Sequence, residues 1–226
     1  MTTLPTKEKP GKYRPDFVHG LIHLTKGREC KPKHTEAGFK RNEEAPTIVS
    51  AFDVLKEIIS DGIIYGSTTD SGCIKGENPA VCLSEMPLPS LRYLAGVTGS
   101  KYDLYGLTFS KRAIFAVEGR PVIYLPNTDI SWVPAEEKWR IVRFKLCTDF
   151  THDKCEDADC RVNIDHSFER EWRVKGNINL SDVRGFLIIV KTMSESIEIH
   201  NMIEGNKLLE SKLRGVLPMD ALFKHM

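Results

Sequence analysis

The sequence has no long hydrophobic stretch, no excess of charge of one sign and no regular cysteine framework. Its apolar runs, such as residues 186–190, are far shorter than the roughly 20 residues that cross a bilayer. The 32 basic and 31 acidic side chains nearly cancel, so no field of the whole protein favours nucleic acid or an anionic membrane. The six cysteines are irregularly spaced, which suits reduced thiols in a cytosol. These absences predict a soluble, cytoplasmic protein with no membrane segment.

Residues 1–15 also lack the apolar core of an export signal, and they carry four basic side chains among three prolines. We therefore expect a flexible leader over residues 1–16. No internal repeat or low-complexity block interrupts the remainder, in which strand-like and helix-like segments are interspersed. Residues 17–226 are predicted to form one α+β domain.

Most of the regular structure is indicated by alternation, apolar stripes and capping residues. A helix is predicted between Ser50, an N-cap, and Gly62, and a second one follows Ser110 over residues 111–118. A third is expected around residues 207–214, followed by a short tail. Strands are predicted at residues 17–25, 80–86, 105–110, 121–125, 140–146 and 185–191.

Residues 167–174 concentrate two carboxylates, two guanidiniums and an indole. As a strand, this segment would carry Glu169, Glu171 and Arg173 on one face, and Phe168, Arg170, Trp172 and Val174 on the other. Same-face neighbours lie roughly 7 Å apart, so both acids would reach one sugar-sized ligand, and Arg173 would hold the pair in its charged form. The alternative is an edge strand whose acids pair with bases of a neighbouring strand.

Other polar residues have more general explanations. His23 and Thr25 share one face of the first strand, although a lone histidine there is more often structural. The Ser110 hydroxyl and the following amides form a helix N-terminus that attracts anions. Residues 26–47 read as a mobile flap or insertion. The cysteines and histidines of residues 147–166 match no zinc spacing, so we expect no metal.

The order of five segments resembles prokaryotic AbiGi-like abortive phage-resistance proteins. These segments are residues 22–25 (Ile-His-Leu-Thr), 54–63, 105–110, 121–124 and 169–173 (Glu-Arg-Glu-Trp-Arg). More distantly, the same order resembles ADP-ribosyltransferases of the His-Tyr-Glu type. The resemblance implies a phage-defence or toxin–antitoxin context. It also implies an ADP-ribosyltransferase-like α+β fold, with a split mixed or antiparallel sheet and short helices.

The second resemblance also implies roles for individual residues, with NAD as the substrate. His23 and Thr25 would hold the dinucleotide, Tyr105 or another aromatic residue would face nicotinamide, and Ser110 belongs to the same middle element. Glu171 would engage the nicotinamide ribose, and Glu169 would orient or deprotonate an acceptor. Apart from the resemblance, Arg173, on the same predicted strand face as both acids, is a further cofactor-binding candidate. One departure is Leu24, where the polymerases of this type have glycine after the histidine.

Three functions stay open at this point. The first is an ADP-ribosyltransferase or NAD glycohydrolase that modifies nucleic acid or protein. The second is a DNA base glycosylase that acts on phage DNA and contacts its backbone through the basic residues of 26–41. The third is a catalytically silent antitoxin or binding protein. The enzymatic functions require His23 and Glu171 to converge on one pocket deep enough for a nucleoside, whereas a buried, salt-bridged Glu171 without a cleft would favour the third.

Overall fold

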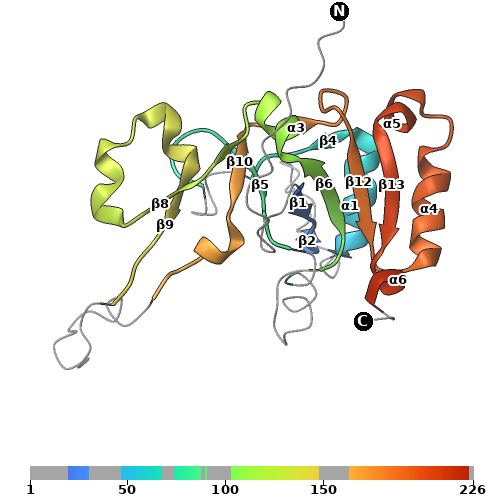
Figure 1. Cartoon of the computed structure of the whole chain (residues 1–226), viewed down its shortest axis with the longest axis horizontal. Helices are drawn as coiled ribbons and strands as arrows, with labels where there is room; N and C mark the ends of the chain where they lie inside the picture. The colour runs from blue at the N-terminus through green and yellow to red at the C-terminus, as the bar shows by residue number, and fades with distance from the viewer. Residues whose placement is uncertain are drawn as a thin grey trace, which may run out of the picture.

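The computed structural model describes residues 20–30, 47–67, 74–87, 90, 103–147 and 163–223. The predicted leader and most of the predicted flap lie outside the described residues. Within them the chain is a mixed α+β structure with several small sheets and short helices, as the sequence predicts (Figure 1).

The largest sheet has four strands in the order β1-β6-β12-β13. These are β1 (Gly20–Leu24), β6 (Gly106–Ser110), β12 (Phe186–Val190) and β13 (Leu213–Pro218). The first three pair in antiparallel fashion, and β13 joins β12 in parallel. Gly106 is required where β6 crosses β1, because an added Cβ would come within 2.1 Å of the carbonyl oxygen of His23.

A second, antiparallel sheet has the order β5-β10-β7. It contains β5 (Ala80–Leu83), β10 (Trp172–Lys175) and β7 (Arg120–Pro121). The two sheets meet at a bridge between Ile22 and Ser84, in which each backbone N–H donates to the other residue's carbonyl at 2.8 Å. Consequently β1, β5 and β10 lie next to one another, although β1 and β10 are about 150 residues apart.

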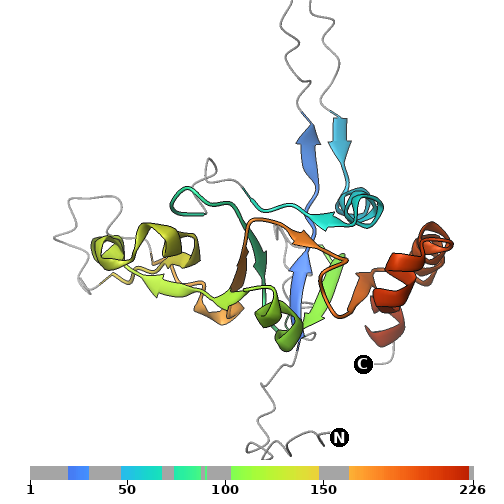
Figure 2. The ribbon, with the colours of Figure 1, turned by 90° about the horizontal axis from the view of Figure 1, so that it is seen from above.

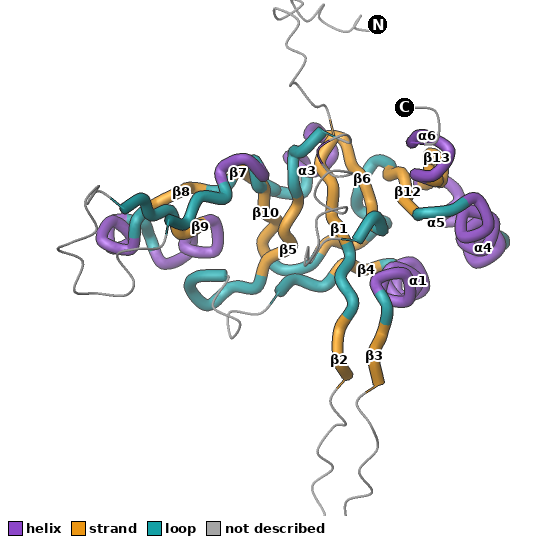
Figure 3. Tube along the Cα trace, turned by 90° about the horizontal axis from the view of Figure 1, so that it is seen from below, coloured by secondary structure: helices purple, strands orange, loops and turns teal. Residues whose placement is uncertain are grey.

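Three two-stranded units surround these sheets. They are β2 (Arg28–Cys30) with β3 (Thr47–Val49), β4 (Ile63–Ile64) with β11 (Ile178–Asn179), and β8 (Ile123–Leu125) with β9 (Ile141–Arg143). The β2–β3 ribbon projects away from the body of the molecule (Figures 2 and 3). The β8–β9 unit lies at the end of the molecule opposite to the C-terminal helices (Figure 1).

The helices are short. They are α1 (Ala51–Asp61), α3 (Lys111–Ala116), α4 (Met193–Ile203), α5 (Lys207–Lys212) and α6 (Met219–Phe223), with 3-10 turns η2 (Asn127–Trp132), η3 (Ala135–Arg140) and η5 (Ser167–Glu169). The limits predicted for α1 are confirmed, since the Ser50 hydroxyl accepts from the Asp53 amide and Gly62 takes a left-handed conformation. None of the described helices is long and apolar enough to cross a membrane.

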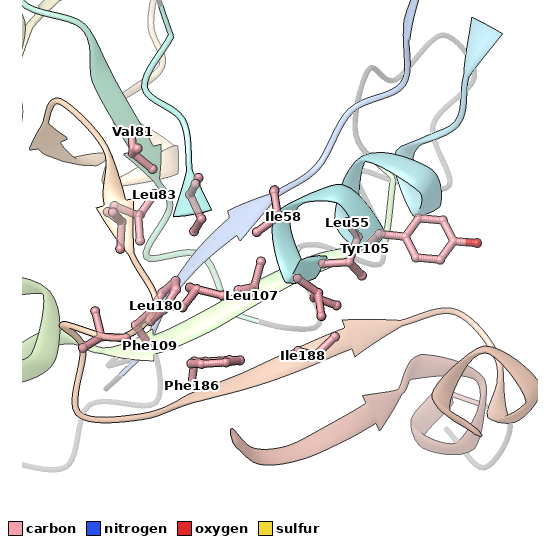
Figure 4. Close-up of a cluster of buried hydrophobic side chains, with 14 of the residues drawn as sticks. Leu55, Ile58, Val81, Leu83, Tyr105, Leu107, Phe109, Leu180, Phe186 and Ile188 are labelled. Atoms are coloured by element: carbon pink, nitrogen blue, oxygen red, sulfur yellow. The ribbon is translucent and has the colours of Figure 1, made fainter. Parts of the chain in front are cut away.

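The main core lies between α1 and the four-stranded sheet (Figure 4). Leu55 and Ile58, one helical turn apart, face Leu107 on β6 and Ile188 on β12, and all four are at most 7% exposed. Trp172 and Val174 of β10 pack against the same cluster. Because strand side chains alternate, this leaves Arg173 on the other face of β10.

Two sequence predictions are wrong. The chain does not run as a strand from residue 167, because residues 167–169 form a 3-10 turn, Arg170 is left-handed at φ 46° and β10 begins only at Trp172. Phe168, predicted on the same face as Trp172 and Val174, is 53% exposed. The predicted helix around 207–214 ends at Lys212, and the expected tail instead begins with β13. The second error has a physical reason. Strand β12 pairs with β6 on one side, and its backbone groups on the other side need the partner that β13 supplies, which local propensity does not reveal.

Candidate active site

A cleft of about 630 Å³ opens beside the three neighbouring strands β1, β5 and β10. Its lining includes residues 22–26 at the end of β1, residues 81–83 of β5 with the following Ser84, and Glu169, Glu171 and Arg173 of the acidic segment. Strand β9 contributes Val142 and Arg143, and the connections contribute Tyr65, Ser67, Ile74, Lys75, Ile164 and His166. His23 and Glu171 therefore line one cleft, and its volume falls in the range of about 300–1,000 Å³ that is usual for small-molecule sites.

His23 is held in one orientation by β5. Its Nδ1 lies 2.9 Å from the carbonyl oxygen of Cys82. A carbonyl can only accept, so Nδ1 carries the hydrogen, and in the neutral ring Nε2 is an acceptor. Burial lowers the pKa of His23 below its ordinary value of 6.5, while the bond to the Cys82 carbonyl opposes that shift only in part. At neutral pH the ring therefore offers a ligand an acceptor rather than a positive charge.

Glu171 forms a close ion pair with Arg173. The Arg173 Nε donates to Glu171 Oε1 at 2.7 Å, and the two side chains are only 4% and 11% exposed, respectively. Arg173 Nη1 also donates to the carbonyls of Trp139 at 2.7 Å and Ile141 at 3.1 Å. Burial is the largest single influence and lowers the pKa of Arg173, but the charge of Glu171, the hydrogen bond to it and the interaction with Cys82 together outweigh burial, so the pKa is raised. Glu171 thus neutralises a buried cation and also faces the cleft.

Cys82 lies between the histidine and this ion pair. It is the direct cross-strand partner of Arg173, and its side chain also interacts with Glu171. Burial, and next the charge of Glu171, raises the pKa of the Cys82 thiol to about 12, although Arg173 opposes the shift. With this pKa the thiol of Cys82 is neutral at physiological pH, and it is not in the thiolate form that acts as a nucleophile.

Glu169 reaches the cleft through the turn rather than through strand alternation. The turn is tied to β5, since the carbonyl oxygen of Glu169 accepts from the Glu85 amide at 3.1 Å and from the Ser84 hydroxyl at 2.8 Å. It is also tied to β8, because the Tyr124 hydroxyl accepts from the Glu171 amide and donates to the His166 carbonyl, both at 3.2 Å. Both acids are therefore presented by a backbone that is fixed on two sides.

Thr25 lines the cleft, but its hydroxyl is hydrogen-bonded to the backbone of the protein. Its side chain is almost fully buried, and the hydroxyl hydrogen is shared between the carbonyls of Ala51 at 2.7 Å and Tyr105 at 3.2 Å. These bonds tie the end of β1 to the start of α1 and to the residue before β6. The predicted contact of Thr25 with a dinucleotide stays a prediction. Because its hydrogen is already donated, the hydroxyl could only accept a hydrogen bond from the ligand.

The structure does not bring Tyr105 and Ser110 into the cleft. The Tyr105 hydroxyl donates to Glu195 on α4 at 2.7 Å, and its ring lies against Phe52, with 5.2 Å between ring centroids. Figure 4 shows the Tyr105 ring pointing outward from the end of the core. Ser110 is the N-cap of α3, where its hydroxyl accepts from the Ala113 amide at 3.1 Å. The Ser110 cap agrees with the predicted start of the helix, whereas nothing in the sequence indicated the Tyr105 contacts.

Sequence reasoning missed several residues of the cleft. Tyr65, an aromatic residue on its lining, is 60% exposed, although it sits between the apolar β4 and the connection to β5. An isolated aromatic residue in a polar connection was the only local signal for it. Cys82 and Ser84 lie in a segment that is predicted only as a strand. Lys75 has no motif around it, and Lys26 is considered only as one of the basic residues of 26–41.

The described residues include no group of three or more His, Cys, Asp or Glu side chains placed to hold a metal ion. A second hollow of about 380 Å³ lies among α4, α5 and β13, and none of the residues predicted for the site lines it. Comparison with known proteins found no matching family model, no matching curated protein and no matching solved structure.

Proposed function

We propose that the cleft binds NAD and that the protein cleaves the bond between nicotinamide and ribose, as an ADP-ribosyltransferase-like enzyme with the corresponding split-sheet fold. The observation that carries this proposal is the shared lining by His23, Glu169 and Glu171, polar side chains from two distant parts of the chain. A neutral acceptor and two carboxylates are the groups that a ribose and a developing sugar cation require.

The chemistry follows from the charges. When the bond between the ribose C1′ and the nicotinamide nitrogen breaks, its electron pair leaves with nicotinamide and positive charge develops on the sugar. Glu171 accepts a hydrogen bond from a ribose hydroxyl and stabilises that charge, as the acids of glycosidases do. Glu169 takes the proton of the water or acceptor hydroxyl that attacks C1′. His23 Nε2 accepts a hydrogen bond from the second nucleoside.

We further propose a role in phage defence, for which the order of sequence segments shared with AbiGi-like proteins is the support. In that role the acceptor is a group on nucleic acid or protein, and water is the acceptor when neither is present. The neutral thiol of Cys82 takes no covalent part in this scheme, since its pKa of about 12 leaves it protonated.

The direct test is incubation of the purified protein with NAD, alone and together with DNA, RNA or protein, followed by mass analysis of every component. We expect free nicotinamide in all reactions and ADP-ribose attached to one class of acceptor. Glu171→Gln should abolish nicotinamide release. The matched control is Glu85→Gln, because Glu85 is similarly buried at 14% side-chain exposure and is paired with Lys111, but does not line the cleft.

One observation favours a different function. The pairing of Glu171 with the buried Arg173 is also what a catalytically silent binding protein needs for stability. In that case no nicotinamide is released, with or without an acceptor, and no base is released from DNA. Release of a base from DNA in the absence of NAD would instead indicate a base glycosylase.

A further inference from the structure

We propose that Lys26 and Lys75 hold the phosphate groups of the substrate, so that the cleft selects a nucleotide over a phosphate-free nucleoside. This inference rests on the proposed function. It gives a role to two cleft residues that the proposed reaction does not use. Both lysines line the same cleft as Glu171.

Each lysine is carried by an anchored piece of backbone. Lys26 directly follows Thr25, whose hydroxyl is bonded to the Ala51 carbonyl. Lys75 follows Ile74, which is 2% exposed and packs with Ala80 and Trp139. The stems of both side chains therefore start from fixed positions, and only the flexible part of each has to be ordered by a ligand.

Within the described residues, the charges of the two lysines are not balanced by an acidic partner. Neither ammonium group forms an ion pair or a hydrogen bond with any side chain or backbone group in the part of the chain that the structure describes. The acids of the cleft have other partners, because Glu171 pairs with Arg173 and Glu169 lies 3.9 Å from His166 Nδ1. Lys75 is in addition half-buried, so part of its side chain is already packed against the protein.

A phosphate group supplies what this part of the cleft lacks. Each phosphate brings negative charge and several acceptor oxygens, and ammonium groups are common phosphate ligands. Tyr65 and Ser67, on the same β4–β5 connection as Lys75, also line the cleft and add hydroxyl groups. The carboxylates that are proposed to act on the ribose would repel a phosphate, whereas the two ammonium groups attract one.

The experiment measures kcat and KM of nicotinamide release from NAD, nicotinamide mononucleotide and nicotinamide riboside. The variants are Lys26→Gln, Lys75→Gln and the double variant. The control is Lys175→Gln at the exposed end of β10, outside the cleft. A charge-assisted hydrogen bond contributes about 1.5–3 kcal/mol, so each substitution should raise KM for NAD about tenfold or more, with kcat changed less than about twofold. KM for the riboside should not change.

A separate binding measurement distinguishes failure of this inference from failure of the proposed function. Calorimetry with ADP and with adenosine needs no catalysis, and the double variant should lose at least about tenfold in affinity for ADP while adenosine binding is unchanged. If the wild type releases no nicotinamide but binds ADP in this way, the phosphate assignment stands and the proposed reaction falls. Equal ADP affinity in wild type and double variant, no ADP binding by the wild type, or an equal rise of KM for NAD and riboside overturns the assignment.

Discussion

Removing the charge of Glu171 should destabilise the protein far more than removing a charge from an ordinary ion pair. Glu171→Gln keeps an oxygen that can accept from Arg173 but removes the negative charge that faces a guanidinium only 4% exposed. Breaking a buried pair by removing one partner costs about 3–5 kcal/mol. Because Glu171 itself borders an open cleft, we expect the lower end, about 3 kcal/mol of the free energy of unfolding.

Two further variants isolate the interaction between the side chains. Arg173→Met removes the buried charge but also leaves the carbonyls of Trp139 and Ile141 without their donor. The double variant Glu171→Gln with Arg173→Met should therefore be more stable than the sum of the single effects implies, by about 2 kcal/mol, as expected for groups in direct contact. Glu85→Gln should cost less, about 1–2 kcal/mol, because its partner Lys111 is 22% exposed whereas Arg173 is 4% exposed.

The assay is urea unfolding at neutral pH, followed by circular dichroism, with the free energy of unfolding extrapolated to water. A cost for Glu171→Gln no larger than that of Glu85→Gln, or a coupling energy below about 0.5 kcal/mol, would refute the reasoning. The same curves define the temperatures at which all variants are folded, and only there can a loss of nicotinamide release be attributed to catalysis.

Three other predictions follow from single contacts. Gly106→Ala should destabilise the protein by about 1–3 kcal/mol or more in urea unfolding, because the new Cβ would collide with the His23 carbonyl oxygen; an unchanged unfolding midpoint contradicts that packing. The pKa of His23 is lowered in the folded protein, so the contribution of the neutral ring to stability should be complete above about pH 6.5 and be lost as the pH falls through the folded-state pKa. NMR titration of the ring measures that pKa, and His23→Gln should remove this pH dependence of the free energy of unfolding. In a variant that retains Cys82 as its only cysteine, the thiol, with a pKa of about 12, should react with a thiol reagent at pH 8 far more slowly in the folded than in the urea-unfolded protein, and equal rates would contradict its environment.

Local signals were sufficient for part of this fold. The Ser50 cap, the stripe through Leu55 and Ile58, and Gly62 lie within one segment, so the limits of α1 could be predicted. The same holds for Ser110 at the start of α3 and for the apolar β12. In contrast, β13 owes its conformation to parallel pairing with β12, and a segment with good helix formers before it and a glycine within it gives no local indication of that partner.

The candidate site shows the same division. The alternation that places Arg173 opposite Trp172 and Val174 could be read from sequence, because β10 is regular from Trp172 onward. The left-handed Arg170 could not, because a non-glycine residue at positive φ depends on the contacts that hold the turn against β5 and β8. Tyr65 and Cys82 join the cleft only through the pairing of distant strands, which no short motif encodes.

The rate of nicotinamide release from NAD, compared between Glu171→Gln and Glu85→Gln under conditions where both are folded, tests the central claim most directly. Loss of a carboxylate that stabilises the developing sugar cation should lower the rate by at least about 100-fold, as removal of comparable electrostatic groups does elsewhere. Glu85→Gln should retain the wild-type rate. Equal rates in the two variants, or no release by the wild-type protein, would contradict the assignment of this cleft as the catalytic site.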